Sequence, residues 1–130
     1  MDKEILALKG SEKRDLFKWA HKNKMQNASF YASDFDLVLV TSSAPWIVAY
    51  LDYKGSGEKI TYTECIVYDV HMDIAPVYIV RGADPKNGPF EINRYTGNGN
   101  TAYVCGLKTW NEFLRWEAGV RQARANAALR

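Results

Sequence analysis

Two apolar segments separated by a short polar loop constrain the fold of this chain more than any other feature. They are FDLVLV at 35–40 and WIVAYLDYK at 46–54, with TSSAP between them. Both are rich in β-branched and aromatic residues, which favour strands, while serine and proline favour a turn. We therefore expect an antiparallel β-hairpin whose second strand ends in Asp52, Tyr53 and Lys54.

The position of the loop, centred near Ala44, fixes the expected register of this hairpin. In an antiparallel pair, one step forward on one strand matches one step back on the other, so Asp36 falls opposite Asp52. Side chains alternate between the two faces of a strand, so Lys54 shares the face of Asp52 while Tyr53 points away. The sequence thus predicts two carboxylates and one ammonium group at one end of a sheet.

This combination of charges indicates a particular chemistry. Two carboxylates placed this close repel each other unless a cation compensates them, and Mg²⁺ favours one or two carboxylates together with water. Such a metal lowers the pKa of bound water and polarises a phosphate, while a nearby lysine can orient or activate the water and neutralise developing charge. Asp36, Asp52 and Lys54 therefore fit metal-assisted phosphodiester hydrolysis. The alternative is that they are ordinary strand-end charges, because short Asp/Lys patterns often occur by chance.

The rest of the chain predicts helices around a mixed sheet. Ser11 can cap an amphipathic helix to about Lys24, and a T-x-x-E capping box at Thr109 opens a final helix over 110–128. Segment 58–74 is ambiguous between strand and helix, and we favour a helix. Further strands are expected within 76–80, 90–95 and 101–107. The fold class is therefore α/β (α+β), a mixed central β-sheet flanked by helices.

Composition is that of an ordinary globular protein. With 130 residues, 47% of them hydrophobic and 25% charged, the chain suits one domain over 1–130. Its first residues lack the apolar run of a signal peptide, and no stretch approaches the ~20 apolar residues of a membrane span, so we expect a cytoplasmic protein without a membrane partner. Cys65 and Cys105 show neither metal-site nor disulfide spacing, so we expect reduced core thiols.

Asp36, followed sixteen residues later by Asp52-Tyr53-Lys54, resembles the D…(D/E)xK signature of the PD-(D/E)xK nuclease superfamily. This superfamily includes type II restriction enzymes, archaeal Holliday-junction resolvases and the nuclease domains of bacterial recombination helicases. The resemblance covers about residues 10–95 and implies a restriction endonuclease-like αβββαβ core. The final helix lies outside the part of the chain that this resemblance covers.

Some residues around the signature depart from the superfamily pattern and others agree with it. Phe35 stands where the pattern has proline, a position that varies in the superfamily, and Asp34 competes with Asp36 for the first acidic role. Superfamily members often add an acid from the first helix; Glu12 or Asp15 matches that place, and we favour Glu12.

A second element of the superfamily has the form Q-x-x-x-Y on the helix after DxK. The run Glu64-Cys65-Ile66-Val67-Tyr68 resembles it, with Glu in place of Gln. Glu64 and Tyr68 would share one face of a helix, but they would also share one face of a strand, so they do not decide the conformation of this segment. Read singly, Glu64 is an acid at the edge of the core and Tyr68 an ordinary core residue.

The resemblance implies a Mg²⁺-dependent or Mn²⁺-dependent endonuclease that hydrolyses phosphodiester bonds in DNA. Asp36 and Asp52 would bind the metal, Lys54 would assist the attacking water, and Glu12, Glu64 and Tyr68 would complete the catalytic site. Basic side chains would hold the nucleic-acid backbone, namely Lys13, Lys18, Arg94 and Arg115. We expect a homodimer if the DNA is duplex, because cutting two strands symmetrically needs two sites. A phage or mobile-element setting would suit such a small nuclease.

Two other functions remain open on the sequence alone. The chain could be a catalytically inactive nucleic-acid-binding or assembly protein on the same scaffold, in which Lys54 or an arginine neutralises the acids internally. It could also be a small α+β protein unrelated to nucleases, with its hairpin acids at exposed tips. Fold analogy does not separate these functions, because function depends on the site.

Overall fold

The computed structural model describes residues 12, 13, 15, 16, 35–42 and 46–128 of the chain. The chain divides into two compact units, Met1–Ala32 and Ser33–Arg130. In the first unit, the described residues are helical and their side chains are exposed. The sheet and the candidate site belong to the second unit.

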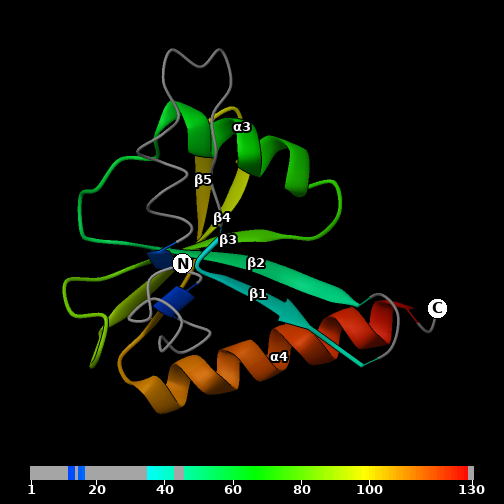
Figure 1. Ribbon diagram of the computed structural model, residues 1–130. Helices are drawn as coiled ribbons and strands as arrows, with labels where there is room; N and C mark the ends of the chain where they lie inside the picture. The colour runs from blue at the N-terminus through cyan, green and yellow to red at the C-terminus, as the bar shows by residue number, and fades with distance from the viewer. Residues whose placement is uncertain (1–11, 14, 17–34, 43–45, 129–130) are drawn as a thin grey trace, which may run out of the picture. The chain divides into compact units, whose positions relative to one another are not determined.

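The second unit is a five-stranded mixed sheet with a helix on each face (Figure 1). The strands are β1 (Leu37–Val40), β2 (Ile47–Lys54), β3 (Val77–Arg81), β4 (Phe90–Gly97) and β5 (Asn100–Leu107), and the helices are α3 (Tyr62–His71) and α4 (Trp110–Ala128). The expected mixed sheet flanked by helices is therefore confirmed. None of the helices in the described part of the chain is both long and apolar enough to span a membrane.

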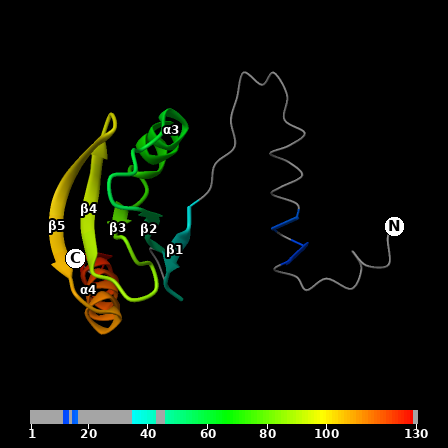
Figure 2. The same ribbon diagram turned by 90° about the vertical axis from the view of Figure 1, so that its left-hand side faces the viewer.

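The strands lie in the order β1-β2-β3-β4-β5, and one pair is parallel. Strands β2 and β3 run parallel because α3 carries the chain across the sheet between them, whereas the other neighbouring pairs are antiparallel. Figure 2 shows α3 and α4 on opposite sides of the sheet. Before α3, the described residues form two strands, not the three of an αβββαβ core, so the restriction endonuclease-like core stays a prediction.

The β1–β2 hairpin has the register expected from the position of its loop. Leu37 pairs with Leu51 and Leu39 pairs with Ala49, and the register shifts only after Leu39. Extending this ladder by one residue toward the N-terminus brings Asp36 opposite the next residue of β2, which is Asp52.

The ambiguous segment at 58–74 contains α3, so the helix favoured from sequence is confirmed. Thr61 caps it: the Thr61 hydroxyl accepts a hydrogen bond from the Glu64 N–H at 3.2 Å. The Glu64 carboxylate in turn accepts one from the Thr61 N–H at 2.9 Å. This capping box satisfies two backbone donors that a helix end leaves unpaired, and it offsets the strand propensity of the valine and isoleucine that follow.

Each helix covers its own hydrophobic cluster. Beneath α4, the buried Phe113 packs with residues such as Leu51 and Ile92, and Trp116 and Val120 pack against this cluster. Trp110 has 42% of its surface exposed because it lies in the first turn of α4, at the edge of the cluster. Cys65 and Cys105 are free thiols, as expected, but they are half-buried and not in the core.

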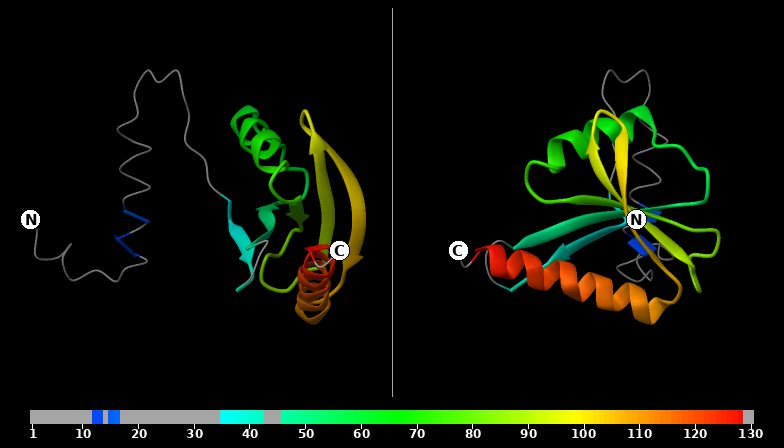
Figure 3. Two further views of the ribbon diagram at one scale, coloured as in Figure 1. Left: turned by 90° about the vertical axis from the view of Figure 1, so that its right-hand side faces the viewer. Right: turned by 180° about the vertical axis from the view of Figure 1, so that it is seen from behind.

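Beneath α3, the second cluster includes the buried aromatic residues Tyr68 and Tyr95. The Tyr95 hydroxyl donates to Asp69 of α3 at 2.6 Å and accepts from the Gly99 N–H at 2.8 Å. The Asn98 N–H also donates to Asp69, at 3.0 Å. These bonds fasten the tip of the β4–β5 hairpin beside α3, as Figure 3 shows.

Candidate active site

Strand β2 positions the candidate site because its side chains alternate between the two faces of the sheet. Leu51 and Tyr53 belong to the cluster under α4. Asp52 and Lys54 point to the α3 face, and each has only 4% of its surface exposed. A charged side chain is rarely buried this deeply unless it is paired, so the partners of these two residues define the site.

The two aspartates meet at the end of the β1–β2 ladder. The Asp36 N–H donates to Asp52 Oδ1 at 2.8 Å, and the Tyr53 N–H donates to Asp36 Oδ2 at 2.7 Å. Asp36 lies just before β1 and is exposed, whereas Asp52 is buried. The pair therefore runs from solvent into the sheet. The two residues are neighbours, as the register predicted, and the Asp36 carboxylate is close enough to contribute to the raised pKa of Asp52.

Lys54 is bound by two glutamates and not by the aspartates. Its Nζ lies 2.8 and 2.6 Å from the two carboxylate oxygens of Glu64, and 3.2 Å from Glu58 Oε2. Glu58 comes from the loop after β2, four residues beyond Lys54, and also accepts from the Gly55 N–H at 3.3 Å. The sequence reasoning missed Glu58, although the Gly-Ser-Gly turn before it was a signal that the chain folds back here.

Tyr68 joins the aspartates to the lysine. Its hydroxyl donates to Asp52 Oδ2 and also lies 3.3 Å from Glu64 Oε2, which binds Lys54. Glu64 and Tyr68 share one face of α3, as expected for a four-residue spacing in a helix. The five catalytic candidates of this unit form one continuous hydrogen-bonded network: Asp36, Asp52, Lys54, Glu64 and Tyr68.

Burial and pairing shift the pKa values of this network in different directions. Burial raises the pKa of Asp52, and the hydrogen bonds from Tyr68 and Asp36 oppose this only in part. Burial alone would lower the pKa of Lys54, but its bonds to Glu64 and Glu58 outweigh burial and raise it. Burial likewise opposes ionisation of Glu64, but Lys54 and the cap at Thr61 lower its pKa overall.

Tyr68 stays a hydroxyl at any ordinary pH. Burial, reinforced by the neighbouring Asp52 and Glu64 carboxylates, raises its pKa. Near neutrality the network therefore consists of an ammonium group, an ionised Glu64, a neutral phenol and a buried aspartate whose charge is disfavoured.

The aspartate pair offers oxygen donors of the type that Mg²⁺ prefers. Each carboxylate oxygen can accept two hydrogen bonds, and Asp36 Oδ1 accepts none from the described residues. Within that part of the chain, no three His, Cys, Asp or Glu side chains form a group that could hold a metal ion. A metal here would therefore rest on Asp36 and Asp52 with water, in keeping with the tendency of Mg²⁺ to retain several waters.

Phe35, directly before Asp36, anchors the chain by packing. Its ring stacks on Tyr50 at 4.5 Å and on Tyr68 at 5.6 Å between centroids, and it meets His71 edge-on at 5.1 Å. His71 also forms a hydrogen bond with the Val67 carbonyl through Nδ1 at 2.7 Å. An aromatic residue thus anchors the chain just before the first aspartate.

Two of the expected nucleic-acid contacts, Arg94 and Arg115, are not brought together with this network. Arg94 lies beside Trp116 and Val120 in a groove on the α4 face, because its even position on β4 shares the face of Ile92. Arg115 is exposed on α4. Both therefore belong to the layer opposite Asp52.

The remaining candidate residues either lie in the first unit or fall outside the residues that the structure describes. Glu12, Lys13 and the alternative acid Asp15 are helical and exposed, and they lie in the unit Met1–Ala32. Lys18 and the competing acid Asp34 lie outside the described residues. The roles expected for these residues stay predictions.

Comparison with known proteins adds no assignment. No protein-family model, curated protein or solved structure matches the chain.

Proposed function

We propose that the protein is a Mg²⁺-dependent or Mn²⁺-dependent nuclease that hydrolyses phosphodiester bonds in DNA. One observation carries this proposal: Asp36 and Asp52 lie side by side at the end of β1–β2, and Lys54 lies on the same strand and face. Burying the Asp52 carboxylate beside a second carboxylate disfavours folding, so such an arrangement favours a chemical role.

Asp36 and Asp52 would hold the metal, which when bound supplies Lewis-acid polarisation of the phosphate and a water of lowered pKa. Asp52 is the fixed donor, because the Asp36 N–H and the Tyr68 hydroxyl orient its two oxygens. Asp36 is the donor on the solvent side, where a substrate can approach. A cation also removes the cost of placing two carboxylates together.

Lys54 serves as a positive charge and not as a base. Its pKa is raised by Glu64 and Glu58, so it keeps its proton near neutral pH. A fixed ammonium group can stabilise the negative charge that develops on a phosphate during attack by water. Glu64 and Tyr68 are positioning residues in this scheme, because they hold Lys54 and Asp52.

The topology supports a restriction endonuclease-like arrangement. The strand that bears Asp52 and Lys54 pairs antiparallel with β1 on one side and, after the α3 crossover, parallel with β3 on the other. The order of the described elements matches the expected core from its second strand onward.

A second candidate is a catalytically inactive nucleic-acid-binding or assembly protein on this scaffold. The pairing of Lys54 with Glu58 and Glu64 favours it, because this ammonium group is already neutralised by carboxylates within the fold. In that case Asp36 and Asp52 would be retained only as part of the hydrogen-bonded network.

A cleavage assay distinguishes the two functions. Supercoiled plasmid, a branched duplex and a single-stranded RNA are incubated with the wild type and with Asp36→Asn, Asp52→Asn and the control Asp73→Asn, with Mg²⁺ or with EDTA. Asp73 is an exposed carboxylate after α3. We expect metal-dependent DNA nicking by the wild type and Asp73→Asn that falls at least a hundredfold in the other two variants. Absence of cleavage by the wild type with any metal would support the second candidate.

A further inference from the structure

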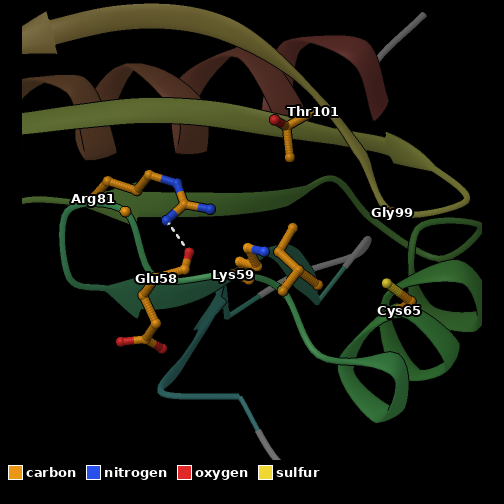
Figure 4. Close-up of a pocket in the computed structure, with 8 residues that line it drawn as sticks. Glu58, Lys59, Cys65, Arg81, Gly99 and Thr101 are labelled. Atoms are coloured by element: carbon orange, nitrogen blue, oxygen red, sulfur yellow. Dashed lines mark hydrogen bonds between the residues drawn. The ribbon is translucent and has the colours of Figure 1, made fainter.

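An open pocket adjoins the network on the α3 face. It has a volume of about 450 Å³ and lies between the loop after β2, the start of α3, β3 and the turn that joins β4 to β5. Figure 4 shows its lining side chains, which include Glu58, Lys59, Cys65, Arg81 and Thr101. Among the described residues of the second unit, neither Arg94 nor Arg115 lines this pocket.

Arg81 connects the pocket to the proposed site. It ends β3 and is the register partner of Lys54 in the parallel β2–β3 pair, so the two residues are neighbours across about 4.8 Å of sheet. Its Nη1 donates to the Glu58 carbonyl and, at 3.4 Å, to the Gly55 carbonyl. Figure 4 shows the guanidinium held on Glu58 with its other terminal nitrogen directed into the pocket.

The charges that face the pocket are positive. Glu58 contributes its carbonyl, while its carboxylate turns away from Arg81 to Lys54 and the Gly55 N–H. Lys59 is exposed on the wall, and its side chain forms no hydrogen bond or ion pair among the described residues. Two cations, the Thr101 hydroxyl and the Cys65 thiol are therefore the polar side-chain groups that line the space.

We propose that this pocket binds a phosphate group of a nucleic-acid strand, one that neighbours the phosphate to be cleaved. The ligand class rests on the proposed function. Arg81 presents a fixed fork of N–H donors, the geometry that suits a phosphate, and Lys59 adds a mobile charge. Ile60 gives one wall an apolar character that can lie against a sugar or a base.

Binding to a fluorescent single-stranded oligonucleotide in EDTA tests this inference without catalysis. The variants are Lys59→Ala, Arg81→Gln and Arg81→Lys, and the control is Arg121→Gln, an exposed α4 residue paired with Glu117 in the opposite layer. We expect Lys59→Ala and Arg81→Gln each to weaken binding about fivefold or more. The slope of log Kd against log salt concentration should also fall by about 0.7 for each lost phosphate contact. The control should change neither.

Competition and folding controls make every outcome decisive. Unlabelled oligonucleotide should compete far better than inorganic phosphate or a mononucleotide; equal competition by the small anions would overturn a strand as the ligand. Lys59→Ala covers the case in which Arg81→Gln loosens the loop, because the Lys59 side chain bonds none of the described residues. If Lys59→Ala bound the oligonucleotide with the same affinity and salt dependence as Arg121→Gln and the wild type, the proposed phosphate-binding pocket would be overturned.

Different results would reject the proposed nuclease function and the proposed phosphate-binding pocket. Binding that depends on Lys59 and Arg81 without any cleavage would retain the pocket and reject the nuclease. Metal-dependent cleavage, together with oligonucleotide binding that neither substitution changes, would retain the nuclease and reject the pocket.

Discussion

The two faces of the sheet are built from the same strands but carry different kinds of side chain. On the α4 face, Ala49, Leu51 and Tyr53 of β2 pack in an apolar cluster around Phe113. On the α3 face, even-numbered residues of β2 place Asp52 and Lys54 in a buried polar network. Apolar burial stabilises both faces, but only the α3 face also carries the desolvation cost of fixing buried charged groups beside its apolar cluster.

This difference teaches where function is to be sought in the fold. Replacing buried ion pairs by apolar residues is often neutral or stabilising, so a polar network of this kind is weak support for the folded state. Its value is that it holds charged groups in fixed positions, as a catalytic site requires. Substitutions on the two faces should therefore have different effects.

The largest expected effect is on the apolar face. Phe113→Ala removes a buried ring from the α4 cluster and should lower the free energy of unfolding by about 3–5 kcal/mol. Urea unfolding at pH 7 measures this loss. Metal binding by the folded variant should be unchanged, and a loss of both together would contradict the separation of the two faces.

Removing the buried cation should have the next largest effect. Lys54→Met leaves Glu64 without its ion pair in a half-buried place and should cost about 3 kcal/mol. The double variant Lys54→Met/Glu64→Gln should recover part of this loss, as measured by a double-mutant cycle in urea.

The same pair gives a pH dependence with a defined sign. The pKa of Glu64 is lowered in the fold, so its stabilising contribution is present above its unfolded pKa and is lost as pH falls through the folded value. In Lys54→Met this acid-side loss of stability should be smaller. An unchanged pH profile of urea unfolding would show that Lys54 is not the cause of the shift.

A smaller effect is expected where the β4–β5 hairpin meets α3. Tyr95→Phe removes the bond to the Asp69 carboxylate and the bond from the Gly99 N–H, at a cost of about 2 kcal/mol. Hydrogen exchange at Gly99 should accelerate, while exchange in α4 should respond only to the change in global stability. Equal acceleration in both regions beyond that change would show that the hairpin tip is not a local unit.

The smallest effect has the opposite sign. Asp52→Asn should raise the free energy of unfolding at pH 7 by about 1 kcal/mol, because burial disfavours the charged carboxylate. The amide oxygen can keep the bond from the Asp36 N–H, and the amide N–H₂ can donate to Tyr68.

The gain should disappear at acid pH. The pKa of Asp52 is raised in the fold, so its protonated form stabilises below the unfolded pKa and this contribution is lost as pH rises through the folded value. Wild type and variant should therefore converge as pH falls. A variant less stable than the wild type at pH 7 would show that the network stabilises the fold.

Local patterns predicted much of this site. Strand alternation and loop position were sufficient to place Asp36 beside Asp52, and the observed Leu37–Leu51 pair confirms that register. The helix favoured over 58–74 is also confirmed; the capping box at Thr61 that stabilises it is readable in the sequence but was not used to predict it. Both features depend on residues close together in sequence, where the geometry of the chain leaves few alternatives.

Contacts between distant segments were not predicted. Arg81 meets the loop at Glu58 only because β3 pairs parallel with β2, and nothing in a single sequence fixes which strands are neighbours. Strand order likewise decides that Arg94 lines a groove beside α4 and not the network around Asp52, and its expected contact with nucleic acid stays a prediction.

The central claim is that Asp36 and Asp52 bind a divalent metal. Calorimetric titration of Mn²⁺ into the wild type, Asp52→Asn and the control Asp73→Asn at pH 7 tests it most directly. The account predicts saturable binding by the wild type and the control, none by Asp52→Asn, and wild-type affinity that falls as acid protonates Asp52. No binding by the wild type, or equal binding by Asp52→Asn, would contradict the account.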